Sequence, residues 1–159
     1  MPEPPVVNAS PLIVLARAGR LELLLTLGER VFVPAAVAEE ISAHSDEAAR
    51  ALSSCAWLVR APAEPISEVV MAWDLGMGES AVLSWAVSRP GTLAVLDDYA
   101  ARTCAEVLGV PVVGTLGLAL RAKARGGVVS ARPLVEDLRS AGLYLSDAVV
   151  RAALALVGE

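Results

Sequence analysis

Short runs of β-branched and other apolar residues alternate with longer stretches of helical periodicity along the chain. Strands that alternate with helices form βαβ units, which build a parallel sheet. The alternation therefore predicts an α/β fold with a central parallel sheet. The five runs predicted as strands are PVVNAS at 5–10, VFVP at 31–34, WLVRAP at 57–62, TLAVLDD at 92–98 and PVVG at 111–114.

Helical patterns fill the intervals between these runs and continue after the last one. Ser10 and Pro11 are suited to the cap and the first turn of the first helix, and Ser130 and Ser146 precede the last two. The run at 57–62 ends in proline, which indicates a short or edge strand. Helices are predicted at 11–19, 21–28, 35–44, 45–56, 76–89, 99–109, 115–127, 130–142 and 146–158.

Length and composition indicate an ordered, soluble chain. With 159 residues, of which 55% are hydrophobic and 19% charged, one domain over 1–159 with a large core is expected. The longest uncharged stretch, at 107–120, contains a proline and falls short of the roughly 20 residues that a bilayer requires. The N-terminus lacks the pattern of a secretory signal, and there are two cysteines. A cytoplasmic location without membrane contact is expected.

Polar side chains follow the predicted strands where the strands end. In an open parallel sheet the functional crevice lies beyond the carboxyl ends of the strands. Asn8 ends the first run, and Asp97 and Asp98 end the fourth. Glu40 lies in the helix that follows the second run, and Glu79 opens a helix behind a GMG turn. Four carboxylates and one carboxamide are therefore expected at one end of the sheet.

Oxygen ligands of this kind favour a hard cation, Mg²⁺ or Mn²⁺, over zinc. Such an ion can hold a phosphodiester and activate water, which predicts a hydrolase acting on phosphodiester bonds. The net charge of −5 argues against a protein that coats nucleic acid, so any contact with nucleic acid must be local. No GxGxxG, GxxxxGK[ST] or GxSxG motif is present, which argues against dinucleotide binding, P-loop chemistry and an α/β-hydrolase triad.

Each candidate also has a simpler explanation. Carboxylates are common at helix N-termini, where the helix dipole favours them, and Asn8 can be a turn residue. The basic segment RAKAR at 121–125 is read first as a solvated helix face and second as an edge that contacts RNA. The adjacent pair Asp97 and Asp98 is the more unusual feature, because it ends an apolar strand.

Five segments together resemble a PIN-like group close to the VapC toxin ribonucleases, and their order and spacing make the resemblance specific. It implies a three-layer α/β/α fold, a divalent-metal site and cleavage of single-stranded RNA. Relatives in toxin–antitoxin pairs are held inactive by a small partner protein and often form dimers. The segments are VVNASPLIVLARAGRLELL, VFVPAAVAEEI, LGMGESAVLSWA, LAVLDDYAARTCAEVLGVPVVGTLGLALRAKARG and LRSAGLYLSDAVV.

The resemblance also implies roles for individual residues. The family's four acidic positions correspond to Asn8, Glu40, Glu79 and Asp98, with Asp97 as an alternate ligand. Asn8 departs from the pattern, because an amide can ligate a metal but brings no charge. The sequence thus leaves two functions open: a ribonuclease, weak or narrowly selective, or a catalytically silent module that binds RNA or a protein partner. Contacts to substrate are expected from Ser10 and Thr115, whose hydroxyls would lie near the phosphate, and less strongly from Arg102 and Tyr99.

Overall fold

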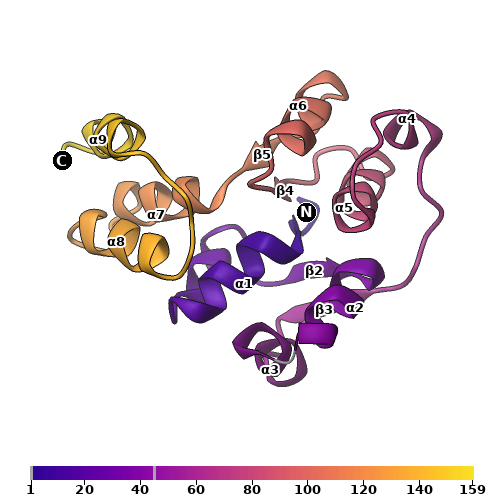
Figure 1. Ribbon diagram of the computed structural model, residues 1–159, viewed down its shortest axis with the longest axis horizontal. Helices are drawn as coiled ribbons and strands as arrows, with labels where there is room; N and C mark the ends of the chain where they lie inside the picture. The colour runs from indigo at the N-terminus through magenta and orange to yellow at the C-terminus, as the bar shows by residue number, and fades with distance from the viewer. Residues whose placement is uncertain (1, 45) are drawn as a thin grey trace.

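The computed structural model describes residues 2–44 and 46–159 and contains a five-stranded sheet whose neighbouring strands are all parallel (Figure 1). Each of the five predicted strands is present, so the predicted α/β class with a parallel sheet is confirmed. The strand order is β3-β2-β1-β4-β5, which puts β3 at an edge as its proline indicated. The strands are β1 (Val6–Val7), β2 (Val31–Pro34), β3 (Leu58–Ala61), β4 (Ala94–Val95) and β5 (Val112–Val113).

The predicted helices are also present, with one change of type. Residues 21–28, predicted as a short apolar helix, contain a 3-10 helix, and a further short helix, α4, follows β3. The helices are α1 (Ala9–Arg17), η1 (Leu21–Thr26), α2 (Ala35–His44), α3 (Glu47–Ser54), α4 (Glu68–Met71), α5 (Met77–Val87), α6 (Tyr99–Val107), α7 (Thr115–Ala124), α8 (Arg132–Ser140) and α9 (Asp147–Ala155).

Two of the three predicted helix caps are wrong. Helix α1 begins two residues early, so Asn8 occupies its N-cap position and Ser10 lies within the first turn. Helix α8 has Ala131 at its N-cap, with no side-chain cap from a neighbouring residue. The third prediction is confirmed, because the Ser146 side chain caps α9 by accepting a hydrogen bond from the Val149 amide.

Helices flank the sheet, as a three-layer fold requires. Helix α5 packs against β1, β2 and β4, and α1 packs against α2, α3 and η1. In Figure 1, α1 and α3 lie on one side of the strands, and α4, α5 and α6 lie on the other. Helices α7 and α8 pack together next to η1, and in Figure 1 they lie on the same side of the strands as α1. None of the helices in the described part of the chain combines the length and apolar character needed to cross a bilayer.

The connections reverse direction between β1 and β4. From β1 the chain proceeds to β2 and β3 on one side, whereas from β4 it proceeds to β5 on the other. The two central strands are completely buried, and their register pairs Val6 with Ala94 and Val7 with Val95. Such a reversal opens a crevice at the carboxyl ends of the two strands. Asn8 follows β1, and the pair Asp97 and Asp98 follows β4 by one residue, so these side chains lie at the crevice.

Glu159 supplies the cap that α8 lacks locally. Its carboxylate accepts hydrogen bonds from the Ser130 hydroxyl and from the amides of Ala131 and Arg132, and Lys123 lies 3.3 Å away. These are the amide groups that a helix N-terminus leaves unsatisfied. The hydrogen bonds, that from Ser130 above all, lower the pKa of Glu159 to about 2. Glu159 therefore ties the segment after α9 to the start of α8.

We expect Glu159→Gln to destabilise the protein at neutral pH, because an amide offers one acceptor oxygen in place of two and loses the charge. Since the folded-state pKa lies below the ordinary value of 4.5, the contribution is complete above about pH 4.5 and is lost as the pH falls toward 2. Urea unfolding at several pH values measures it. A difference between the two proteins that stays constant from pH 6 to pH 2.5 would contradict this assignment.

Candidate active site at the carboxyl end of the sheet

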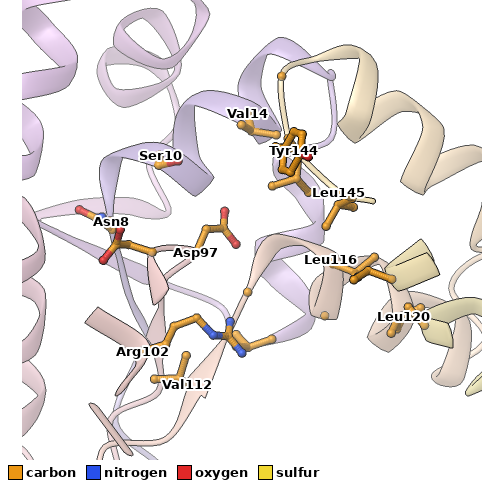
Figure 2. Close-up of a pocket in the computed structure, with 18 of the residues that line it drawn as sticks. Asn8, Ser10, Val14, Asp97, Arg102, Val112, Leu116, Leu120, Tyr144 and Leu145 are labelled. Carbon is orange, nitrogen blue, oxygen red and sulfur yellow. The ribbon is translucent and has the colours of Figure 1, made fainter. Parts of the chain in front are cut away.

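A groove of about 1100 Å³ lies at the crevice between β1 and β4. One side is polar and includes Asp97 and Arg102; the other, which includes Leu116, is apolar (Figure 2). The apolar side comes from β5, α7, α9 and the segment that leads into α9. The polar lining is Asn8, Ser10, Glu79, Asp97, Asp98 and Arg102, and the larger apolar lining is Val112, Val113, Leu116, Leu120, Leu143, Leu145, Val149 and Leu156.

Asn8 holds a buried oxygen that no described residue satisfies. Its side chain is 4% exposed, and its Oδ1 has no hydrogen-bond partner. Its backbone is fixed, because its amide donates to Val95 O at 3.1 Å and its carbonyl accepts from Leu12 N. A buried acceptor without a donor costs about 1–3 kcal/mol, so such atoms usually mark a functional or water-binding position. The oxygen is therefore available to a ligand in the groove.

Gly78 brings the Asn8 oxygen together with Glu40. A methyl group added to Gly78 would lie 2.9 Å from Asn8 Oδ1 and 3.2 Å from Glu40 Oε2. The first turn of α5 thus leaves room for two oxygens, one from Asn8 after β1 and one from Glu40 in α2, which are more than 30 residues apart in the sequence. A hard cation accepts oxygen ligands of this type. On this observation the residues present fit a divalent metal ion.

Glu79 and Asp98 complete the acidic rim and are partly held by the backbone. The Glu79 side chain lies close to Gly76, the residue at the N-cap position of α5. A methyl group added to Gly76 would lie 2.5 Å from Glu79 Oε2. Asp98 is exposed and caps α6, because its Oδ2 accepts a hydrogen bond from the Ala101 amide at 3.0 Å. Both carboxylates line the groove and occupy helix N-termini, where the dipole stabilises negative charge.

Asp97 is bound to the start of α7 through both of its oxygens. Its Oδ1 accepts from the Thr115 amide at 2.7 Å, and its Oδ2 accepts from the Thr115 hydroxyl at 2.5 Å. Thr115 is completely buried, so its hydroxyl lies behind Asp97. Arg102 donates from Nη1 to Leu96 O, and both Arg102 and Asp97 press against Gly114, where a methyl group would come within 3.0 Å of each. Asp97 therefore connects the ends of β4 and β5.

In residues 2–44 and 46–159, no three acidic, thiol or imidazole side chains lie close enough together to hold one metal ion. Like charges without a cation between them repel, and the side chains of Glu79 and Asp98 turn to the helix N-termini. Glu40 lines a neighbouring cavity of about 480 Å³ with Ser10 and Arg17, and it meets the other donors only at Gly78. The carboxylates thus surround one region without forming a closed set.

The structure brings most of the predicted residues to one groove. Asn8, Ser10, Asp98 and Arg102 line it with Glu79 and Asp97, whereas Thr115 lies behind it. Two features were missed. The first is Gly78, whose lack of a side chain leaves space for the Asn8 and Glu40 oxygens. Its place in the GMG turn was the only sign of this in the sequence. The wall formed by 142–156 carried no signal for a charged ligand, because its side chains at the groove are apolar apart from the phenol of Tyr144.

We expect Thr115→Val to lower the free energy of unfolding by about 1.5–3 kcal/mol, because the charged, half-buried Asp97 carboxylate loses a donor while the shape of the side chain at 115 is kept. Thr103→Val is the matched control, since the Thr103 hydroxyl bonds only the Tyr99 carbonyl on an exposed helix face. Urea denaturation compares the two. Equal, small losses in both variants would show that the Asp97–Thr115 contact contributes little.

Comparison with known proteins identifies the family to which the chain belongs. A family model described as a PIN domain matches residues 4–159. No curated protein and no solved structure is significantly similar to the chain. The parallel five-stranded sheet flanked by helices agrees with the three-layer PIN-like fold, and PIN domains have in general a nuclease-type fold that works with divalent metals. Because the match covers nearly the whole length, the chain belongs to the PIN domain family.

Proposed function

We propose that this protein is an endoribonuclease of the PIN type that depends on Mg²⁺ or Mn²⁺ and cuts single-stranded RNA. The observation that carries the proposal is the buried Asn8 Oδ1, which lacks a donor and lies with Glu40 Oε2 beside Gly78. Glu79, Asp97 and Asp98 line the groove that opens from this point. An acidic site at a topological switch point is where a parallel sheet binds its substrate.

The proposed metal ligands are Asn8, Glu40, Glu79 and Asp98. When bound, the ion would supply the positive charge that polarises a phosphodiester and makes water acidic enough to attack phosphorus. Asp97 would act through Thr115, by fixing the position of the loop after β4 and hence of Asp98. Glu79 and Asp98 line the groove from the N-termini of α5 and α6.

Arg102 is the proposed anchor for the substrate phosphate. It is the one cation among the described residues that line the groove, and it forms no salt bridge within the described part of the chain. Its hydrogen bond to Leu96 O holds the guanidinium at the strand end, beside Asp97. A positioned guanidinium binds phosphate oxygens strongly. Ser10, exposed in the first turn of α1, would offer a hydroxyl to the same strand.

The biological role is proposed from the likeness to the VapC group. On that basis the protein is the toxin of a toxin–antitoxin pair, works in the cytoplasm and is restrained by a small antitoxin protein. The apolar wall of the groove, which includes Leu120 and Val149, offers a partner protein a surface beside the acidic residues. Exposed Val69, Met71 and Met77 on α4 and at the start of α5 offer an apolar surface for a homodimer.

The second candidate function is a catalytically silent module that binds RNA or a protein partner. Asn8 favours it, because an amide at this position brings no charge to attract the ion or to activate water. The same residue therefore distinguishes the two candidates.

An assay of single-stranded RNA cleavage, run separately with Mg²⁺, with Mn²⁺ and with a chelator, distinguishes the ribonuclease from the silent module. We expect metal-dependent cleavage by the parent protein and its loss in Glu79→Ala, because that carboxylate lines the groove. Glu29→Gln, an exposed acid before β2, is the control. Cleavage that appears only in Asn8→Asp would support the silent module and reject the enzyme.

Metal binding without turnover gives a separate test. We expect Gly78→Ala to weaken Mn²⁺ binding at least about tenfold, because its methyl group would displace the Asn8 and Glu40 oxygens. Gly28→Ala is the matched control, since a methyl group there meets nothing closer than 3.5 Å. Titration followed by Mn²⁺ electron paramagnetic resonance measures both. Unchanged affinity in Gly78→Ala would place the ion elsewhere.

A further inference from the structure

A second, smaller pocket lies beside the groove, on the outer face of α6. It has a volume of about 420 Å³, which is room for one nucleobase with its sugar. Arg102 and Val112 line both cavities, so the two adjoin at these residues. Figure 2 shows Arg102 next to Val112 at the edge of the groove. The lining of the smaller pocket is Tyr99, Arg102, Thr103, Glu106, Val110 and Val112.

The polar members of this lining form one stripe along α6. Tyr99, Arg102, Thr103 and Glu106 have the spacing i, i+3, i+4 and i+7, which places them on one face of a helix. The opposite face, with Ala101, Cys104 and Ala105, is buried in the core. The stripe is therefore held rigidly, and it begins at the residue that follows Asp98.

Tyr99 offers an aromatic surface at the end of the stripe next to the proposed metal ligands. Its side chain is 85% exposed, so the ring is not used for packing within the chain. Proteins that bind single-stranded RNA stack unpaired bases on such rings. A base that follows a phosphate held by Arg102 would lie within reach of this ring and over the apolar surface of Val112.

Glu106 offers acceptors only, and no described residue pairs with its carboxylate. Long side chains on a helix lean toward its N-terminus, which turns Glu106 toward Arg102. Two carboxylate oxygens match two adjacent donors, and guanine presents these as N1–H and N2–H₂ on its Watson–Crick edge. Adenine, cytosine and uracil each present an acceptor beside the donor, which the carboxylate repels.

We propose that the pocket on α6 is a guanine subsite, in which Tyr99 stacks on the base, Glu106 accepts its two donors and Arg102 holds the adjoining phosphate. The subsite deepens the proposed function, on which its role in cleavage depends: it would place a guanosine next to the bond that is cut. Base selection then comes from α6, and the acidic residues at the strand ends supply the chemistry.

Binding of GMP, AMP, CMP and UMP in the presence of chelator, followed by amide chemical shifts, tests the subsite without turnover. We expect GMP to bind most tightly and Tyr99→Ala to weaken it roughly tenfold, whereas Tyr99→Phe keeps the ring and the affinity. Glu106→Gln should lower the ratio of the affinities for GMP and UMP about tenfold. Glu29→Gln should change neither. Circular dichroism confirms that each variant is folded.

Equal binding of the four nucleotides, or GMP binding that Tyr99→Ala leaves intact, would overturn the subsite. So would binding of GMP but not of a short single-stranded RNA with a single guanosine, because the site would then serve free nucleotides.

Mapping the RNA cut sites distinguishes failure of the guanine subsite from failure of the proposed ribonuclease activity. Cuts beside guanosine that scatter in Glu106→Gln support the subsite, and cuts with no base preference reject it while leaving the ribonuclease in place. Selective GMP binding without any cleavage rejects the ribonuclease alone.

Discussion

The direct pairing of β1 with β4 is the constraint on which the site depends. These strands are separated by more than 80 residues in the sequence, yet both of the residue pairs that they form, Val6 with Ala94 and Val7 with Val95, are completely buried. The pairing extends one residue beyond β1, because the Asn8 amide donates to Val95 O. A shift of either strand by one residue would exchange the side chains of its two faces, and both faces are packed against helices, so the core packing would be lost. The positions of Asn8 and of the Asp97–Asp98 pair are thus fixed by the core.

The second requirement is that β5 and α7 stay in place beside β4. Leu96 continues the ladder by donating to Val113 O, and Asp97 then binds the amide and hydroxyl of Thr115. Because both Asp97 oxygens accept hydrogen bonds, this carboxylate differs from Asp98, which is exposed and bonds one helix amide. Two adjacent acids therefore perform different tasks: one joins two strand ends, and the other faces the groove.

The sequence predicted the strands, the helix pattern and the strand-end position of the acids, because β-branched runs and the periodicity of helices are local signals. Contacts between distant side chains carried no such signal. The start of α1 at Ala9, with Asn8 at the N-cap position in place of Ser10, and the capping of α8 by the distant Glu159 depend on how the chain closes on itself. Equally, the sequence placed Asp97 and Thr115 at one end of the sheet without showing that they bind each other.

Asn8 also changes the electrostatics of the groove in the absence of an ion. A carboxylate in its buried position would lie beside Glu40 at Gly78, where the two like charges would repel each other and the buried one would lose its hydration. An amide removes that repulsion, and the cost is one unsatisfied oxygen. In the proposed metal site, the amide would also lower the charge that attracts a cation, so the protein would be more stable without the ion and would bind it less tightly. Such a site would favour an ion that is held partly by the substrate, since the phosphate would then supply the missing negative charge.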